Sequence, residues 1–210
     1  MEQRKGLQYS LQWKANFLPV MQRRARSCAP FGVFFCVIAA PMLGHAAPKV
    51  HMWQTKVPAV TEGYVDVAAS PEEIYRTLTD YAHWTQVFTD IEWVKHKKGG
   101  REDALLECKS RTYGKTSQHF QFSNRPNKLL RYRLTDGPPG VVLWEEIWLE
   151  PLGQEGLTRI RIKMHVSIGG VLCWLTTEAK IRKYRERKVL RDLRDLGSRW
   201  APPATNSEGS

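Results

Sequence analysis

Residues 64–93 read YVDVAASPEEIYRTLTDYAHWTQVFTDIEW, and this stretch is the most informative part of the sequence about the fold. Its first six residues indicate a strand. Ser70 then precedes Pro71, with Glu73 three positions beyond the serine, which is the capping box that starts a helix. Residues 80–84 predict a second short helix directly after the first. The stretch therefore predicts a strand followed by two short helices.

A series of strands is predicted between Ile91 and Ile168. The clearest covers residues 159–168, where apolar residues alternate with charged or polar ones, so that one face of the strand is apolar. The connections are short and rich in turn residues, which favours antiparallel neighbours. Four earlier strands are predicted at residues 104–113, 115–123, 128–135 and 141–150.

The period of the apolar residues becomes helical near the C-terminus. From Trp174 to Trp200 they recur on one side of a helix that would be nearly 40 Å long, at about 1.5 Å per residue. Such a helix is long enough to cover the apolar face of the sheet. We therefore predict an α+β fold with an antiparallel sheet of six to seven strands curled around this helix, and with the two short helices closing one end.

This order of elements resembles the START-like superfamily, also called SRPBCC. The superfamily includes polyketide cyclase-like, lipid-transfer and coenzyme-Q-binding proteins. The resemblance covers roughly Val57 to Trp200, and it rests on the order of the elements rather than on individual residues. It implies the helix-grip fold and a cavity between sheet and helix that holds a hydrophobic small molecule such as a lipid, a quinone or a polyketide.

The N-terminus has the pattern of an export signal. A basic segment at residues 21–26 precedes a mostly apolar run at residues 31–43, and small residues stand just before Ala47. The apolar run is too short to span a membrane as a helix, which favours a cleaved secretory signal over an anchor. We expect an exported protein, periplasmic or secreted; whether synthesis starts at Met1 or Met21 is open. The predicted organisation is an N-terminal extension with the signal peptide at 1–46, a START-like domain at 54–200 and a disordered tail at 201–210.

Removal of residues 1–46 would leave a single domain with two cysteines. That segment holds six Lys/Arg and one Glu, so the net charge falls from +11 by 5 to +6. Cys108 and Cys173 would remain, and they either form one disulfide or stay as two buried thiols. The histidines have no metal-binding spacing, and nucleophile and phosphate-loop motifs are missing from the sequence. We therefore predict no metal, no cofactor and no catalytic residue.

Two adjacent carboxylates are the best candidates for chemistry. Glu145 and Glu146 lie in an otherwise apolar strand, and successive strand residues point to opposite faces, so one of the two should face the concave side. A carboxylate in an apolar cavity has a raised pKa and can act as an acid or base. The alternative, which we favour, is that it pairs with a nearby arginine or hydrogen-bonds a ligand. A cyclase or dehydratase that uses Glu145 or Glu146 is the second interpretation.

Aromatic side chains give the stronger indication of a ligand site. A helix laid across a curled sheet can leave unfilled space near the short helices, of roughly a few hundred Å3. Tyr81, Trp84 and Phe88 are expected to form its gate. The predicted ligand-binding residues are Tyr81, Trp84, Phe88, Phe120, Phe122, Tyr132, Trp144, Glu146, Trp148, Ile162 and Met164.

The C-terminal helix is strongly basic. It carries nine Lys/Arg against four Asp/Glu, a net charge of +5. A solvated face with i,i+4 ion pairs is the simplest explanation, but the excess positive charge also suits docking to an anionic membrane or a partner protein. We expect a monomer that does not bind nucleic acid. The residues predicted for membrane docking are Lys180, Arg182, Lys183, Arg187, Arg191 and Arg194.

Overall fold

In a computed structural model of the protein, the described residues are 47–55, 59–112, 117–137, 139–153, 156–170 and 176–201. They belong to one compact unit, Ala46–Ser210. The predicted signal peptide and the tail beyond residue 201 lie outside the described residues, as do Cys173 and Trp174. Among the described residues, no helix is both long enough and apolar enough to cross a membrane.

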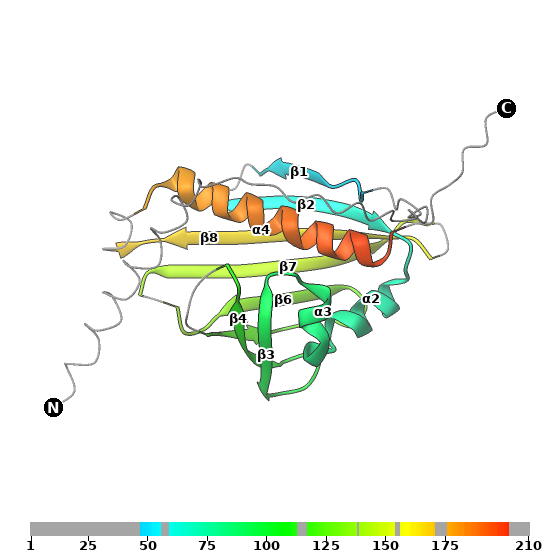
Figure 1. The fold of residues 1–210 in the computed structure, drawn as a ribbon, viewed down its shortest axis with the longest axis horizontal. Coiled ribbons are helices and arrows are strands. Elements are labelled where there is room, and N and C mark those ends of the chain that lie inside the picture. Colours follow the sequence, from blue (N-terminus) through cyan, green and yellow to red (C-terminus); the bar gives the residue numbers. More distant parts are fainter. Residues whose placement is uncertain are drawn as a thin grey trace, which may run out of the picture. The chain divides into compact units, whose positions relative to one another are not determined.

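From β2 onward the elements follow one another in the order that the sequence predicts (Figure 1). They are β1 (His51–Gln54), β2 (Val60–Val67), α2 (Pro71–Leu78), the short helix η1 (Tyr81–His83), α3 (Trp84–Val87), β3 (Ile91–Lys98), β4 (Leu105–Ser110), β5 (Gln118–Phe122), β6 (Leu129–Leu134), β7 (Val141–Pro151), β8 (Thr158–Ile168) and α4 (Glu178–Arg199).

The strands form one antiparallel sheet that is curled but not closed. Their order is β1-β2-β8-β7-β6-β5-β4-β3, so β1 and β3 are the two edges. The predicted α+β fold with a long C-terminal helix is confirmed. The predicted count of six to seven strands is wrong, since the described residues form eight. The prediction began the domain too late to include β1, whose four residues, HMWQ, are too few to show a period.

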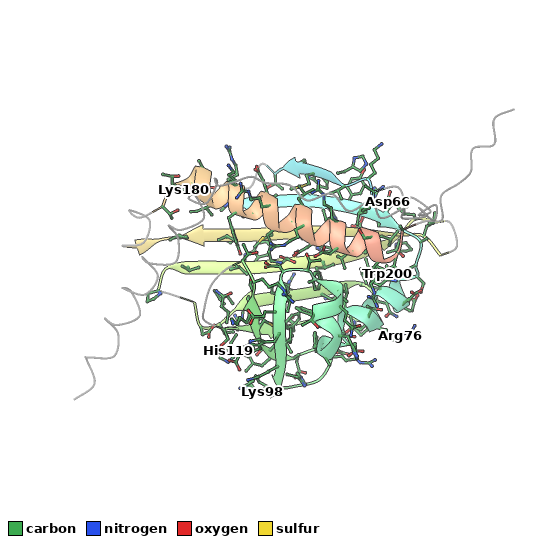
Figure 2. The ribbon with its side chains drawn as sticks, in the orientation of Figure 1. Asp66, Arg76, Lys98, His119, Lys180 and Trp200 are labelled. Carbon is green, nitrogen blue, oxygen red and sulfur yellow. The ribbon has the colours of Figure 1, made fainter. Side chains whose placement is uncertain are left out.

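The start of α2 shows how the local sequence fixes the chain. Ser70 caps the helix, because its Oγ accepts a hydrogen bond from the Glu73 backbone N–H at 3.2 Å. The Glu73 side chain accepts instead from Trp200 Nε1 at 3.0 Å. Glu73 thus connects the start of α2 to the end of α4, where Figure 2 shows Trp200.

Helix α4 lies close against the β2 side of the sheet (Figure 1). Two glycines allow this approach. A Cβ atom added to Gly63 of β2 would stand 2.8 Å from Leu193 Cδ1, and one added to Gly197 of α4 would stand 2.9 Å from Val65 Cγ2. The inner faces of β4 to β7 are therefore left to other side chains, and a cavity lies there.

Candidate functional site

A cavity lies between α4, α3 and strands β3 to β7. It encloses about 60 Å3, taken as the space open to the centre of a water molecule. One water needs roughly 10–15 Å3 on that measure, so the space suits a few waters or a small chemical group. It is smaller than the few hundred Å3 expected from the sequence, because aromatic rings fill much of the curl. Its apolar wall includes Trp84, Phe88, Phe120, Phe122, Leu143 and Ile147.

Strand register explains how the wall is built. A row of inward-facing residues crosses the sheet at Thr61, Met164, Glu145, Tyr132 and Phe122, from β2 to β5. Each is the cross-strand neighbour of the next, and alternation puts all of them on the side of α4. The last three line the cavity. The row therefore places a carboxylate and a phenol side by side in a largely apolar surface.

Four side chains form a polar cluster at the α4 side of the cavity: Glu145, Tyr132, Lys188 and Asp192. Tyr132 hydrogen-bonds the Glu145 carboxylate. Lys188 hydrogen-bonds Asp192 Oδ2, one turn further along α4. Lys188 Nζ lies 3.8 Å from Glu145 Oε2. The two groups form an ion pair, but this distance is too long for a hydrogen bond. Glu145 and Asp192 are only 1% and 2% exposed, so the two carboxylates are shielded from solvent.

Burial and mutual charge set the protonation of the polar cluster. Burial raises the pKa of Glu145 to about 7, although Lys188 opposes the shift. Burial also raises the pKa of Asp192. Burial alone would lower the pKa of Lys188, but the carboxylates of Asp192 and Glu145 raise it well above its ordinary value. The lysine is therefore charged at neutral pH, while Glu145 is poised between its two protonation states.

Cys108 is a free thiol on the same wall. Burial raises its pKa to about 12, so the reactive thiolate is scarce at neutral pH. Cys173, the other cysteine of the predicted domain, lies outside the described residues. Across the described ranges, no group of three or more His, Cys, Asp or Glu side chains is arranged to hold a metal ion.

Side-chain hydrogen bonds fasten α4 to the connection between α3 and β3, at the edge of the cavity. Asp90, which lines the cavity, pairs with Arg191 at 2.9 Å and accepts from Ser110 Oγ at 2.7 Å. Thr89 donates from its backbone N–H to Asp195 Oδ2 at 2.9 Å. We call these five residues the α4 clasp. It holds the segment after Phe88 against the helix.

The structure brings several predicted site residues together. Trp84, Phe88, Phe120, Phe122 and Tyr132 all line the cavity. Three others are buried but are not part of the lining: Tyr81, Ile162 and Met164.

Tyr81 stands behind the cavity wall. Its ring lies 5.6 Å from that of Trp84 and 5.2 Å from that of Phe122, measured between centroids. Its hydroxyl donates to the Arg101 carbonyl at 3.0 Å and accepts from Asn124 Nδ2 at 3.0 Å. The Tyr81 hydroxyl is thus anchored to two connections between strands, the one after β3 and the one after β5.

The placement of Glu146, Trp144 and Trp148 differs from the prediction. All three lie on the outer face of the sheet, because alternation along β7 turns the odd-numbered residues inward. Glu146 pairs with Arg131 at 2.7 Å and accepts from Trp148 Nε1 at 3.0 Å. The Trp144 ring stacks on His165 at 5.2 Å. Of the two adjacent carboxylates it is therefore Glu145 that reaches the cavity.

Helix α4 contributes residues to the cavity lining that the sequence did not predict. Tyr184, Lys188 and Asp192 are spaced four residues apart and line the cavity from one side of the helix. The sequence shows Lys188 and Asp192 as an i,i+4 pair, which is usually a surface feature. The signal that distinguishes them is Tyr184, an aromatic residue at the same helical phase, which marks that side as facing the sheet.

The basic residues of α4 divide between two surroundings. Arg185 and Lys188 are engaged inside the protein, and Arg191, predicted for membrane docking, is held by Asp90. The remaining residues of that prediction are exposed. They are Lys180, Arg182, Lys183, Arg187 and Arg194, and Figure 2 shows Lys180 near the start of α4.

Comparison with known proteins identifies a family and similar folds. The family model described as polyketide cyclase / dehydrase and lipid transport matches residues 58–199. The Zhui aromatase/cyclase from Streptomyces sp. R1128 is similar in structure, with a TM-score of 0.56 and 17% sequence identity over 70% of this chain and 93% of that chain.

Two further solved structures share the fold, with similar TM-scores. The protein XoxI from Bacillus cereus has a TM-score of 0.55 and 11% identity, over 68% of this chain and 95% of its own. The di-domain aromatase/cyclase BexL, from the BE-7585A biosynthetic pathway, has a TM-score of 0.56 and 17% identity, over 65% of this chain and 44% of its own. No curated protein matches the sequence closely enough to count as a relative. The predicted START-like architecture is confirmed by the family model and these structures.

Proposed function

Because the chain belongs to the polyketide cyclase/dehydrase and lipid transport family, we propose that it is an exported protein that binds a hydrophobic small molecule in the cavity under α4. The family and the fold fit a role in hydrophobic ligand binding. The observation that carries the proposal is a cavity with an aromatic and aliphatic wall and one polar end. Such a wall binds apolar surface, and the polar end orients it. A lipid, a quinone or a polyketide-like molecule would suit both.

Ligand entry requires movement, since the cavity of about 60 Å3 is too small for a lipid as it stands. Phe88 is the best candidate to move. It follows α3, which is a single turn, and its movement requires release of the clasp bonds of Thr89 and Asp90 from α4. Trp84 is more firmly fixed, because its Nε1 donates to the Leu78 carbonyl at 2.8 Å.

The test is to purify the protein from cells that express the full chain, extract it with organic solvent and identify bound molecules by mass spectrometry. Binding of phospholipids and quinones is then measured directly. A lipophilic ligand in the extract, or specific binding of either class, is expected. The proposal fails when the extract holds no lipophile and neither class binds.

A matched pair of variants connects binding to the cavity. Leu143→Trp adds a large ring to the cavity wall, whereas Val142→Trp adds the same ring to the outer face, where Val142 is 51% exposed. We expect the first to weaken binding at least about tenfold and the second to leave it unchanged, since only the first fills the space that the ligand needs. Equal effects of the two variants would argue against this cavity.

An enzyme of the cyclase or dehydratase type is the second candidate, and the position of Glu145 favours it. Burial raises the pKa of this carboxyl to about 7, which suits a group that takes a proton in one step and returns it in another. Dehydration of a β-hydroxy ketone is such a reaction: a base removes the α-proton, the hydroxyl leaves as water, and a conjugated enone forms. Tyr132 lies beside Glu145 and could donate to the leaving oxygen.

The enzyme candidate is tested with aromatic β-hydroxy ketones whose enone products absorb light. If Glu145 is the acid or base, Glu145→Gln lowers the rate by roughly 100-fold to 10,000-fold while substrate still binds. Glu146→Gln serves as the control, because Glu146 lies on the other face of the sheet. Binding without any turnover by the unaltered protein would leave ligand binding as the function.

The exposed basic residues of α4 also support docking to an anionic membrane surface. Each basic residue near such a surface contributes about 1 kcal/mol to binding. We expect sedimentation with vesicles that contain anionic lipid at low salt, and its loss in Lys183→Glu/Arg187→Glu. The same charge change on the edge strand, Lys95→Glu/Lys97→Glu, is the control and should matter less. No binding to anionic vesicles at low salt would remove this role.

A further inference from the structure

One oxygen of the polar cluster lacks a hydrogen bond. Glu145 is 1% exposed, and within the described part of the chain its Oε2 has no hydrogen-bond partner. Lys188 Nζ stands 3.8 Å away, which is beyond hydrogen-bond distance. A buried carboxylate oxygen without a donor is unfavourable, and such groups are usually satisfied by a bound molecule or by water. Glu145 lines the cavity, so that molecule would be its occupant.

A shift of Lys188 toward Glu145 would disturb a contact that Lys188 already makes. Lys188 is hydrogen-bonded to Asp192 one turn along the same helix, and Asp192 also lies 3.9 Å from Arg191. Moving the ammonium toward Glu145 would weaken its bond to Asp192. The separation between Lys188 Nζ and Glu145 Oε2 therefore persists while Lys188 is bonded to Asp192. A single polar atom between the two could make a hydrogen bond of ordinary length to each.

The charges around the gap restrict the chemistry of that atom. A carboxylate would stand beside Glu145 and Asp192, and an ammonium would stand beside Lys188 with Arg191 nearby. Either would bring like charges together in a buried place. A hydroxyl carries no charge, donates to an ionised carboxylate and accepts from an ammonium. It also accepts from the carboxyl when Glu145 is protonated.

We propose that the molecule bound in the cavity carries a neutral hydroxyl group, which lies between Glu145 Oε2 and Lys188 Nζ. The inference rests on the proposed function, because it assumes that the cavity binds an apolar molecule. The apolar body then packs against Phe120, Leu143 and Ile147. The aromatic wall provides the attraction for that body, and the polar cluster selects its head group.

Four probes with one ring system separate head group from body: naphthalene, 2-naphthol, 2-naphthoate and 2-(aminomethyl)naphthalene. Their binding to the purified protein is measured by calorimetry at neutral pH. We expect 2-naphthol to bind at least about tenfold more tightly than each of the other three, as one hydrogen bond to charged groups allows. Equal affinity for naphthalene and 2-naphthol would overturn the inference, as would a preference for either charged probe.

Glu145→Leu tests the assignment to this residue, with Glu146→Leu as the neighbour on the outer face. In Glu145→Leu the preference for 2-naphthol over naphthalene should disappear while naphthalene still binds. In Glu146→Leu the preference should stay. Persistence of the preference in Glu145→Leu would show that another group recognises the hydroxyl. The comparison of probes on the unaltered protein needs no variant, so a variant that fails to fold leaves that test intact.

The same measurement separates this inference from the proposed function. Binding of naphthalene and 2-naphthol with equal affinity would overturn the hydroxyl alone and keep the hydrophobic site. Failure of all four probes to bind, together with an extract that holds no lipophile and no binding of phospholipids or quinones, would overturn both.

Discussion

Glu145 is buried with Tyr132 on one side and Lys188 on the other, and its protonation is linked to folding. Its pKa is about 7 in the folded protein and near 4.5 when exposed. The folded protein therefore binds more protons than the unfolded chain between these two values. Under that condition the free energy of unfolding falls as the pH rises.

We accordingly predict that the protein loses stability from about pH 4.5 to about pH 7, by on the order of 3 kcal/mol from this residue. Glu145→Gln should flatten the slope, because an amide does not titrate. Urea unfolding at a series of pH values measures it. Glu146→Gln is the control and should keep the slope of the unaltered protein; a slope that survives in Glu145→Gln would contradict the assignment.

Asn124 supports the back of the cavity wall. Its amide donates to Tyr81 Oη at 3.0 Å and to the Arg101 carbonyl at 2.6 Å, and its oxygen accepts from the Arg131 backbone N–H at 3.2 Å. We predict that Asn124→Ala lowers the free energy of unfolding by about 1–3 kcal/mol, since buried polar groups lose partners. Tyr81→Phe, which removes one hydroxyl, should cost less. Chemical denaturation decides, and an Asn124→Ala protein as stable as the original would refute the role.

The strand period showed that one of Glu145 and Glu146 must face the cavity, but the tryptophans obscured which one. Trp144 and Trp148 share the phase of Glu146, and large apolar rings suggest an inner face. In the structure these rings lie outside, where Trp144 stacks on His165 and Trp148 lies near Arg161. The polar face of β8 provides the missing information, because His165 and Arg161 stand opposite Trp144 and Trp148 in the register. The register between β7 and β8 depends on the folded sheet and cannot be inferred from the sequence of β7 alone.

Among the elements, α4 determines where the cavity can form. It approaches β2 closely because Gly63 and Gly197 have no side chains at the contact. The sequence predicted the helix itself from its period, and the start of α2 from the Ser70 cap. It did not predict the approach of α4 to β2, because a glycine in a strand can equally mark a bulge or a weak point.

We predict that Gly63→Ala destabilises the protein by about 1–3 kcal/mol through overpacking. The new Cβ would lie 2.8 Å from Leu193 Cδ1 and equally close to the His51 carbonyl oxygen, which is backbone and cannot move aside easily. Gly169→Ala is the control, because its Cβ would meet only the Gly140 carbonyl oxygen at 3.7 Å. Thermal unfolding compares the two. Equal melting temperatures would mean that α4 can shift without loss.

For the whole molecule, the sequence predicted the fold class well and the cavity less well. The order of the elements can be inferred along the sequence, because most elements have their own apolar period or a capping residue. The size of the cavity depends on how Tyr184, Lys188 and the aromatic rings share the space inside the curl. That packing involves residues far apart in the chain, and their rotamers follow from the assembled fold rather than from local pattern.

Export of the whole protein is a prediction from the N-terminal sequence alone. When the full chain is expressed in a Gram-negative host, we expect a processed form that begins at Ala47, 164 residues long since 210 minus 46 is 164. Intact mass and N-terminal sequencing of the periplasmic fraction would identify it. Unprocessed protein found only in the cytoplasm would refute the signal peptide.

The open sheet has a consequence for how copies of the protein meet. An unclosed sheet presents the backbone of its edge strands to any other strand, and exposed edges promote aggregation. The β3 edge carries Lys95, Lys97 and Lys98, all exposed, while the β1 edge is only four residues long. Pairing two β3 edges would bring two sets of three lysines together. Repulsion between them opposes pairing of the two edges, so the sheet can stay open without promoting fibrous association.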